Sequence, residues 1–236
     1  EISNLQSQII SSNVSNNNRD GLQYLEKLEG IVSEDDHLIR QFILRSKVAL
    51  GYLDGEDIRP YTFDEKEKML FEALYLTVPK FDIEEIDKNY YTVEEIKIIN
   101  QIALNYSDAG QNKKAIDVYN QLLKYIEKHL MNLKESNGLV ILISYNCSRS
   151  LYLEKRYEES IAAANLGLEV SIEERCTSCL GGLLSVLGHA FHAEGRLEES
   201  KKYFYQSFYI YSVLHDDINI ELGKKNLKEF FNIDIL

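Results

Sequence analysis

Two cysteines and two histidines near the C-terminus have types and spacing that could hold a metal ion. They form the pairs Cys176-x-x-Cys179 and His189-x-x-His192, and thiolates and imidazoles are common ligands of Zn²⁺. On one continuous helix, Cys179 and His189 would lie about 15 Å apart, because each residue rises about 1.5 Å. Zinc requires every ligand atom to lie within about 2.0–2.3 Å of the same ion. Only a sharp break in the helix would bring the two pairs together, so we expect no metal site.

No other arrangement of residues predicts catalysis. The sequence has no glycine-rich phosphate loop, no H-E-x-x-H motif, and no serine or cysteine nucleophile beside a histidine in a turn. The paired glutamates Glu158-Glu159 and Glu198-Glu199 stand at expected helix starts, where negative charge suits the helix dipole. We therefore expect no enzyme activity, no catalytic residue and no cofactor.

The composition excludes several function classes. Lys and Arg number 26 and Asp and Glu number 38, which gives a net charge of −12 over 236 residues. Such an acidic surface repels phosphate backbones, so this chain alone is a poor nucleic-acid binder. The longest apolar run, from Leu139 to Ile143, is far shorter than the roughly 20 residues of a membrane span. Three cysteines and no signal peptide favour a reducing compartment, which we expect to be the cytoplasm.

The segments that would have to position any site carry sequence patterns typical of helices. Thr62-x-x-Glu65 and Thr92-x-x-Glu95 have the capping-box pattern, in which threonine and glutamate satisfy helix N-terminal N–H groups. A further helix is predicted from roughly Asp36 to Tyr52, and Gly51 and Gly55 mark its end. Strand-type alternation is not sustained anywhere. The sequence therefore predicts an all-α protein of about ten helices.

An internal repeat gives these helices an order. Each copy has a first helix with apolar residues at i, i+3 and i+7 and a small residue at i+4, then a return helix with a second small residue. The middle copy lacks the turn glycine and most of the aromatic residues. The recurring small residues are Ala103, Ser148 and Gly188 on the first helices, and Ala115, Ser160 and Ser200 on the return helices.

This spacing resembles the tetratricopeptide repeat (TPR), although the return-helix residues recur after 45 and 40 residues rather than about 34. The resemblance implies a TPR-like right-handed superhelix of stacked antiparallel helix hairpins. We expect the array to occupy residues 1–215 and a capping or dimerisation helix to occupy 216–236. Hairpins in 1–90 are degenerate, and clearer repeats span about 96–125, 141–170 and 181–207.

Two segments of the sequence indicate a protein family more specifically than the repeat does. Residues 73–81 (ALYLTVPKF) and 91–103 (YTVEEIKIINQIA) resemble the C-terminal domain of Rgg-type transcription regulators, which belong to the RRNPP group of Gram-positive peptide sensors. The resemblance implies a quorum-sensing domain that forms a homodimer and binds a short signalling peptide in the cytoplasm. In that family an N-terminal helix-turn-helix domain binds DNA, and we expect it to be absent from this chain, which lacks an initiator Met.

Helix geometry predicts the peptide-binding residues. If the apolar stripe of each first helix faces the core, the neighbouring stripe faces the concave side. Asn can donate to and accept from a peptide backbone, and Arg149 can hold a carboxylate bidentately. The same residues are also compatible with a solvated face or with internal hydrogen bonds. The predicted set is Asn100, Leu104, Tyr145, Arg149, Tyr152, Ser185, His189 and His192, with a second stripe at Arg40, Ile43 and Lys47.

The C-terminal segment is too apolar for a free tail. We expect it either to cap the array or to join a partner subunit, with a predicted dimer interface at Phe230, Phe231, Ile233 and Leu236. Two other functions stay open: a TPR scaffold or co-chaperone that binds a protein tail, and a Rap-like inhibitor of response regulators.

Overall fold

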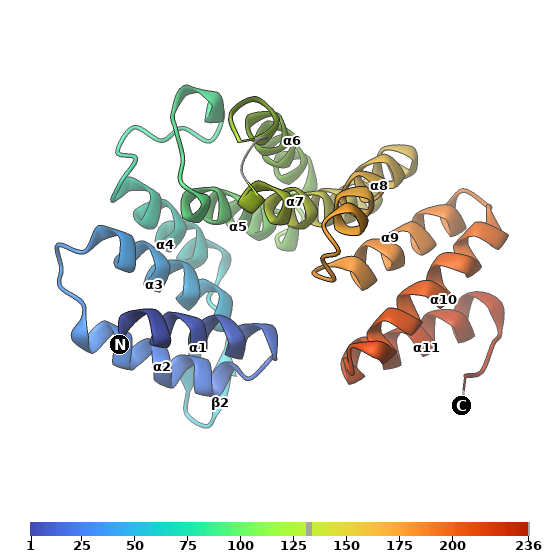
Figure 1. The fold of residues 1–236 in the computed structure, drawn as a ribbon, viewed down its shortest axis with the longest axis horizontal. Coiled ribbons are helices and arrows are strands. Elements are labelled where there is room, and N and C mark those ends of the chain that lie inside the picture. Colours follow the sequence, from blue (N-terminus) through green and yellow to red (C-terminus); the bar gives the residue numbers. More distant parts are fainter. Residues whose placement is uncertain (131–133, 236) are drawn as a thin grey trace. The chain divides into compact units, whose positions relative to one another are not determined.

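Eleven α-helices account for most of the described residues, which are 1–130 and 134–235 of the computed structural model (Figure 1). The chain divides into two compact units, Glu1–Ala109 and Gly110–Leu236. The all-α prediction is confirmed. The first unit contains α1 (Ile2–Val14), α2 (Asn18–Ile31), α3 (His37–Leu50), β1 (Tyr52–Asp54), β2 (Asp57–Arg59), α4 (Phe63–Tyr75), the 3₁₀ helix η1 (Ile86–Lys88) and α5 (Val93–Asp108). The second contains α6 (Asn112–His129), α7 (Lys134–Leu153), α8 (Tyr157–Glu173), α9 (Leu180–Ala193), α10 (Leu197–Val213) and α11 (Asp217–Phe231).

Three helices of the first unit, α3, α4 and α5, begin at the expected capping residues. The Thr62 side chain accepts from the Glu65 N–H while the Glu65 carboxylate accepts from the Thr62 N–H, and Thr92 with Glu95 repeats the arrangement at the start of α5. The Asp36 carboxylate accepts from the Ile39 N–H at the start of α3. Each cap satisfies helix N–H groups that have no partner within the helix. The two predicted capping boxes are therefore confirmed.

A buried carboxylate connects three elements of the first unit. Glu95 is 4% exposed, and its two oxygens accept from the Thr77 hydroxyl and, at 2.6 Å, from the Thr92 N–H. Gln41 on α3 donates to the same Thr77 hydroxyl and, at 2.9 Å, to the carbonyl of Ala73. Because burial of an unpaired carboxylate is unfavourable, these partners are what allow Glu95 to lie inside the unit.

A short antiparallel hairpin follows α3, where the sequence indicated only the end of a helix. Tyr52 pairs with Arg59, and Leu53 pairs with Ile58. Gly55 has a φ of +65° in the two-residue turn, a conformation that glycine adopts without a Cβ clash. Strands of three residues are too short to produce a recognisable alternation, which is why the sequence did not reveal them.

Each helix hairpin of the second unit is joined at the small residues that define the repeat. The Ser160 hydroxyl donates at 2.8 Å to the carbonyl of Ser148, which joins α8 to α7. The Ser200 hydroxyl donates at 2.7 Å to the carbonyl of Gly188, which joins α10 to α9. A Cβ at Gly188 would lie 2.9 Å from the Phe204 ring, so the absence of a side chain permits this packing. In the first copy of the repeat, α5 and α6 belong to different compact units.

The last helix covers α10 and the end of α9 within the same chain, and Figure 1 shows α9, α10 and α11 as consecutive helices. The Phe230 ring stacks on Phe204 with centroids 5.4 Å apart, and Phe231 and Ile233 pack on the same cluster. Three of the residues predicted for a dimer interface are therefore engaged inside the chain, as a capping helix requires. The fourth, Leu236, lies outside the described residues.

Candidate functional site

The face shared by α7 and α9 carries six of the predicted peptide-binding residues. On α7 they occupy positions i, i+4 and i+7, and on α9 the spacing is the same, so each triplet lies along one stripe of its helix. The two helices contact each other, and the two stripes meet at side chains. We call this surface the α7–α9 face; its members are Tyr145, Arg149, Tyr152, Ser185, His189 and His192.

Contacts between the stripes fix the aromatic side chains. The Tyr145 ring lies against Gly182 of α9, where an added Cβ would be 2.6 Å from a ring carbon. At the other end, the rings of Tyr152 and His189 have centroids 5.7 Å apart. Burial raises the pKa of Tyr145, with the charge of Arg149 opposing it, and burial also raises the pKa of Tyr152. Both phenols therefore keep their protons at neutral pH and can donate hydrogen bonds.

Arg149 is the cation of this face. Its side chain is exposed, and its guanidinium carbon lies 5.7 Å from the centroid of the Tyr145 ring. Within the described part of the chain it makes no ion pair, unlike Arg156 and Arg196, which pair with Glu159 and Glu199. The guanidinium is therefore free to bind an anionic or carbonyl group in a ligand.

The two histidines lie at the covered end of the face. His189 contacts Phe204 and Phe230 edge-on, at centroid distances of 4.8 and 5.5 Å, and the ring of His192 is 4.4 Å from that of Phe230. The Asn226 amide nitrogen of α11 lies 3.5 Å from His189 Nε2. Burial, followed by the neighbouring His192, lowers the pKa of His189, so its imidazole is neutral at neutral pH. A ligand on the α7–α9 face would meet these histidines beside the chain's own C-terminal helix.

Asn100 and Leu104 do not fit the expected pattern of exposure. Asn100 is 5% exposed, so its amide does not lie on an open stripe, and Leu104 is half-buried on the same helix. Most positions of α5 are buried, so that helix has no single stripe that faces solvent. We therefore correct the expectation that the Asn100 amide is exposed to a ligand.

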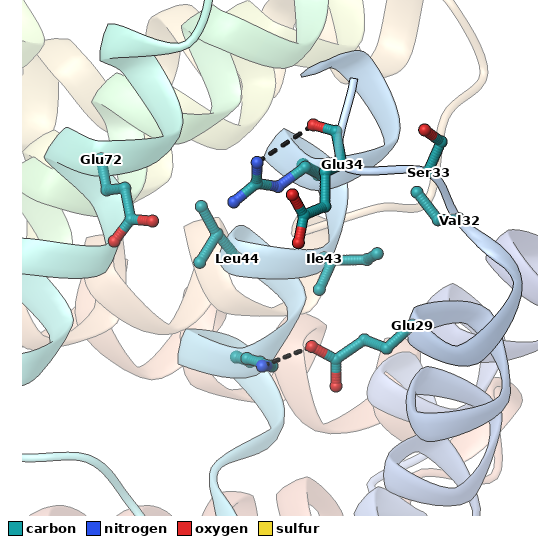
Figure 2. A pocket seen from close by; sticks show the side chains of 9 residues that line it. Glu29, Val32, Ser33, Glu34, Ile43, Leu44 and Glu72 are labelled. Carbon is teal, nitrogen blue, oxygen red and sulfur yellow. Dashed lines mark hydrogen bonds and ion pairs between the residues drawn. The ribbon is translucent and has the colours of Figure 1, made fainter. Parts of the chain in front are cut away.

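The second predicted stripe lines a pocket of the first unit, with a volume of about 330 Å³ (Figure 2). Arg40, Ile43 and Lys47 all contribute to its wall from α3. Lys47 Nζ lies 2.5 Å from a carboxylate oxygen of Glu29 on α2, and Arg40 donates at 3.1 Å to the main-chain carbonyl of Glu34. The structure thus brings the three predicted residues together around one cavity.

The acidic side of that pocket was not predicted. Glu29, Glu34 and Glu72 belong to α2, the α2–α3 loop and α4. No motif relates these three residues in the sequence, because only the packing of the helices brings them beside Arg40. An indirect signal was available in the charges of the α3 stripe, since two cations on a half-buried face require anions nearby.

No group of three or more His, Cys, Asp or Glu residues that could hold a metal occurs among the described residues. Cys179 has a left-handed backbone conformation just before α9, and burial raises its pKa to about 11. Cys147 is buried in α7, and burial raises its pKa to about 12. Both thiols are therefore protonated and weakly nucleophilic at neutral pH. Of the described helices, none combines the length and the apolar character needed to traverse a lipid bilayer.

Solved structures with a similar fold include PlcR, RapI and a TPR-like repeat protein. PlcR of Bacillus thuringiensis, crystallised with the peptide PapR7 and DNA, is 19% identical, with a TM-score of 0.71 over 94% of this chain and 73% of PlcR. The apo form of RapI is 14% identical, with a TM-score of 0.66 over 98% of this chain and 77% of RapI. A TPR-like repeat protein described as a kinesin light chain of Podosopora anserina is 12% identical, with a TM-score of 0.55 over 91% and 96% of the two chains. These similarities confirm the TPR-like fold.

Family membership comes from the sequence. No curated protein matches the chain significantly. The model of the RNPP family C-terminal domain matches residues 67–232, which is well over half of the chain and includes the whole α7–α9 face. The match confirms the group of regulators that the sequence resemblance indicated, while the Rgg subtype stays a prediction. The chain belongs to the RNPP family and carries its C-terminal domain.

Proposed function

We propose that this chain is the ligand-sensing and dimerisation domain of a cytoplasmic quorum-sensing transcription regulator, and that it binds a short linear signalling peptide. The observation that carries the proposal is the α7–α9 face, with its exposed and unpaired Arg149 between neutral tyrosines. The family match to residues 67–232 supports a regulatory rather than an enzymatic role.

The chemistry of the α7–α9 face suits a peptide main chain. Arg149 would bind a carboxylate or a main-chain carbonyl, because a guanidinium presents several N–H donors in one plane. Tyr145 and Tyr152 would donate from their hydroxyls and offer ring surface to apolar side chains. Ser185 of α9 is half-buried and adds a hydroxyl that can donate and accept.

The transcriptional part of the proposal involves further partners. DNA would be bound by an N-terminal helix-turn-helix domain outside the sequence given, since a net charge of −12 disfavours binding by this segment. We also propose a homodimer. Phe230 and Phe231 pack on α9 and α10 of their own chain, so a dimer formed through them would first require α11 to leave that site.

A second function has one observation in its favour. RapI resembles this chain over 98% of its length, so inhibition of a response regulator by protein binding remains an alternative, as does a TPR scaffold that binds a protein tail. The three functions predict different ligands: a short free peptide, a folded receiver domain or an extended tail.

Peptide binding at Arg149 is the test. The purified chain is incubated with a synthetic library of short linear peptides, retained peptides are identified by mass spectrometry, and their affinity is measured by titration calorimetry. Arg149→Ala should weaken binding about tenfold or more, as expected for loss of a charge-assisted hydrogen bond. Arg149→Lys should retain part of the affinity.

Arg196→Ala is the matched control, since it removes an exposed arginine that is already paired with Glu199. Its affinity for the peptide should equal that of the wild type. Retention of no peptide, or equal losses in the two alanine variants, would contradict the proposal. Binding of a protein tail only would favour the scaffold.

A further inference from the structure

The pocket of the first unit has an arrangement of charges that the α7–α9 face does not explain. It lies between α2, the α2–α3 loop, α3 and α4, all within residues 1–109. Its volume of about 330 Å³ is at the lower end of the range of about 300–1,000 Å³ for small-molecule sites. It can therefore accommodate one or two residues of a ligand rather than a whole peptide.

The floor of the pocket is aliphatic. Ile43 is buried and Leu44 is half-buried, and both line the cavity from α3. Val32 adds a third branched side chain from the loop before α3. Contact with such a floor removes an aliphatic side chain of a ligand from water, which favours binding.

The charged side chains around this floor leave an excess of negative charge. Lys47 is neutralised by Glu29 at 2.5 Å. Arg40 uses one N–H for the carbonyl of Glu34 and forms no ion pair in the described part of the chain. Nor do the carboxylates of Glu34 and Glu72 have an ion-pair partner among the described residues. One unpaired cation and two unpaired anions thus remain in the wall, which favours a ligand with a positive charge.

The positions of these groups limit further which chemical groups the ligand can carry. Figure 2 shows Glu34 and Glu72 on opposite sides of Leu44, and each comes from a different segment. Because Leu44 lies between them, a single cationic group can meet only one of the two carboxylates, while the remaining N–H groups of Arg40 can donate to an oxygen acceptor nearby. A ligand with an ammonium group, an aliphatic side chain and an adjacent carbonyl group satisfies all three requirements.

We propose that this pocket binds an unblocked α-amino group on an aliphatic residue. The ammonium pairs with the Glu72 carboxylate, away from the Arg40 guanidinium that is bonded to the main chain of Glu34. The aliphatic side chain contacts Ile43 and Leu44, and the carbonyl oxygen accepts from Arg40. The N-terminus of a peptide and a free amino acid share this chemistry. The site is separate from the α7–α9 face and does not depend on the function proposed for it.

The experiment titrates the full chain with four probes by isotope-edited NMR: L-leucinamide, N-acetyl-L-leucinamide, L-leucine and the tripeptide Leu-Gly-Gly. L-leucinamide should shift the amide signals of α3, and N-acetyl-L-leucinamide should bind at least about tenfold more weakly, because acetylation removes the charge. Tighter binding of Leu-Gly-Gly than of L-leucine assigns the site to a peptide end, and the reverse order assigns it to a free amino acid. Equal binding of the acetylated and free amides, or no binding of any probe, would overturn the proposal.

Variants locate the binding and separate it from the α7–α9 face. Glu72→Gln should weaken L-leucinamide binding about tenfold, and Glu72 is exposed, so the variant should fold normally. Glu26→Gln removes an exposed carboxylate of α2 that does not line the pocket, and it should bind as the wild type does. Arg149→Ala should also leave L-leucinamide binding unchanged. If Glu72→Gln binds L-leucinamide as tightly as Glu26→Gln does, the pocket is not the site.

Discussion

The hydroxyl of Ser200 donates a 2.7 Å hydrogen bond to the main-chain carbonyl of Gly188, and both residues are buried. Ser160 and Ser148 form the same bond at 2.8 Å in the preceding hairpin, again across 12 residues of sequence. The small residues of the repeat therefore do more than permit close approach: the serine of the return helix bonds directly to the first helix.

Removal of this hydroxyl should destabilise the second unit. Ser200→Ala leaves the carbonyl of Gly188 without its donor from α10, and we expect the free energy of unfolding to fall by about 1 kcal/mol. Urea denaturation followed by circular dichroism measures the change. The control is Ser212→Ala, also on α10, whose hydroxyl bonds at 2.8 Å only to the carbonyl of Phe208 in its own helix. Both variants replace serine by alanine in the same helix, so equal losses would show that the bond between helices contributes nothing.

Two glycines of the second unit should respond oppositely to alanine. A Cβ at Gly188 would lie 2.9 Å from the ring of Phe204, which is fully enclosed and cannot move aside, so Gly188→Ala should lower the free energy of unfolding by about 1–3 kcal/mol. A Cβ at Gly138 on α7 meets nothing within 4 Å. Gly138→Ala should therefore stabilise the chain by about 0.5–1 kcal/mol through helix propensity. Thermal denaturation of both variants tests the difference in sign, and stabilisation by Gly188→Ala would contradict the packing of α9 on α10.

Stability should depend on pH through His189. Burial lowers its pKa in the folded chain, whereas in the unfolded chain the pKa returns to about 6.5. Below about pH 6.5 the unfolded state binds more protons than the folded state, so the free energy of unfolding falls as the pH is lowered through that value and is fully retained above it. Urea denaturation at about pH 7.5 and about pH 5.5 should show a smaller loss for His189→Gln than for the wild type. His37→Gln changes an exposed histidine at the start of α3, and it should keep the full pH dependence of the wild type.

The structural features predicted best from the sequence are those determined by residues close together in the chain. The capping pairs Thr62–Glu65 and Thr92–Glu95 form as expected because both members lie in one helical turn. The small residues of the repeat were recognised from spacing alone, although their hydrogen bonds were not. The spacing also placed each triplet of α7 and α9 on one stripe of its helix, and none of the six side chains is fully buried; their contact with a peptide stays a prediction.

What depends on the packing of distant segments could not be predicted. Asn100 was placed on an open stripe, but α5 is buried on most sides, and no helical wheel contains that information. Glu72 lies beside Arg40 only because α4 packs on α3. For Phe230, the sequence left two partners open, its own array or a second subunit, since an apolar helix end has the same composition in either case.

Glu95 also affects how the first unit can open. Its carboxylate, through Thr77, is linked to Gln41 of α3, and through Thr92 to the start of α5. A helix that detached alone would strand a negative charge or an amide in an apolar interior, which is far less favourable than exposing all of these groups to water together. Partial fraying in this region is thereby suppressed, and the segments joined at this carboxylate are expected to melt as one cooperative block.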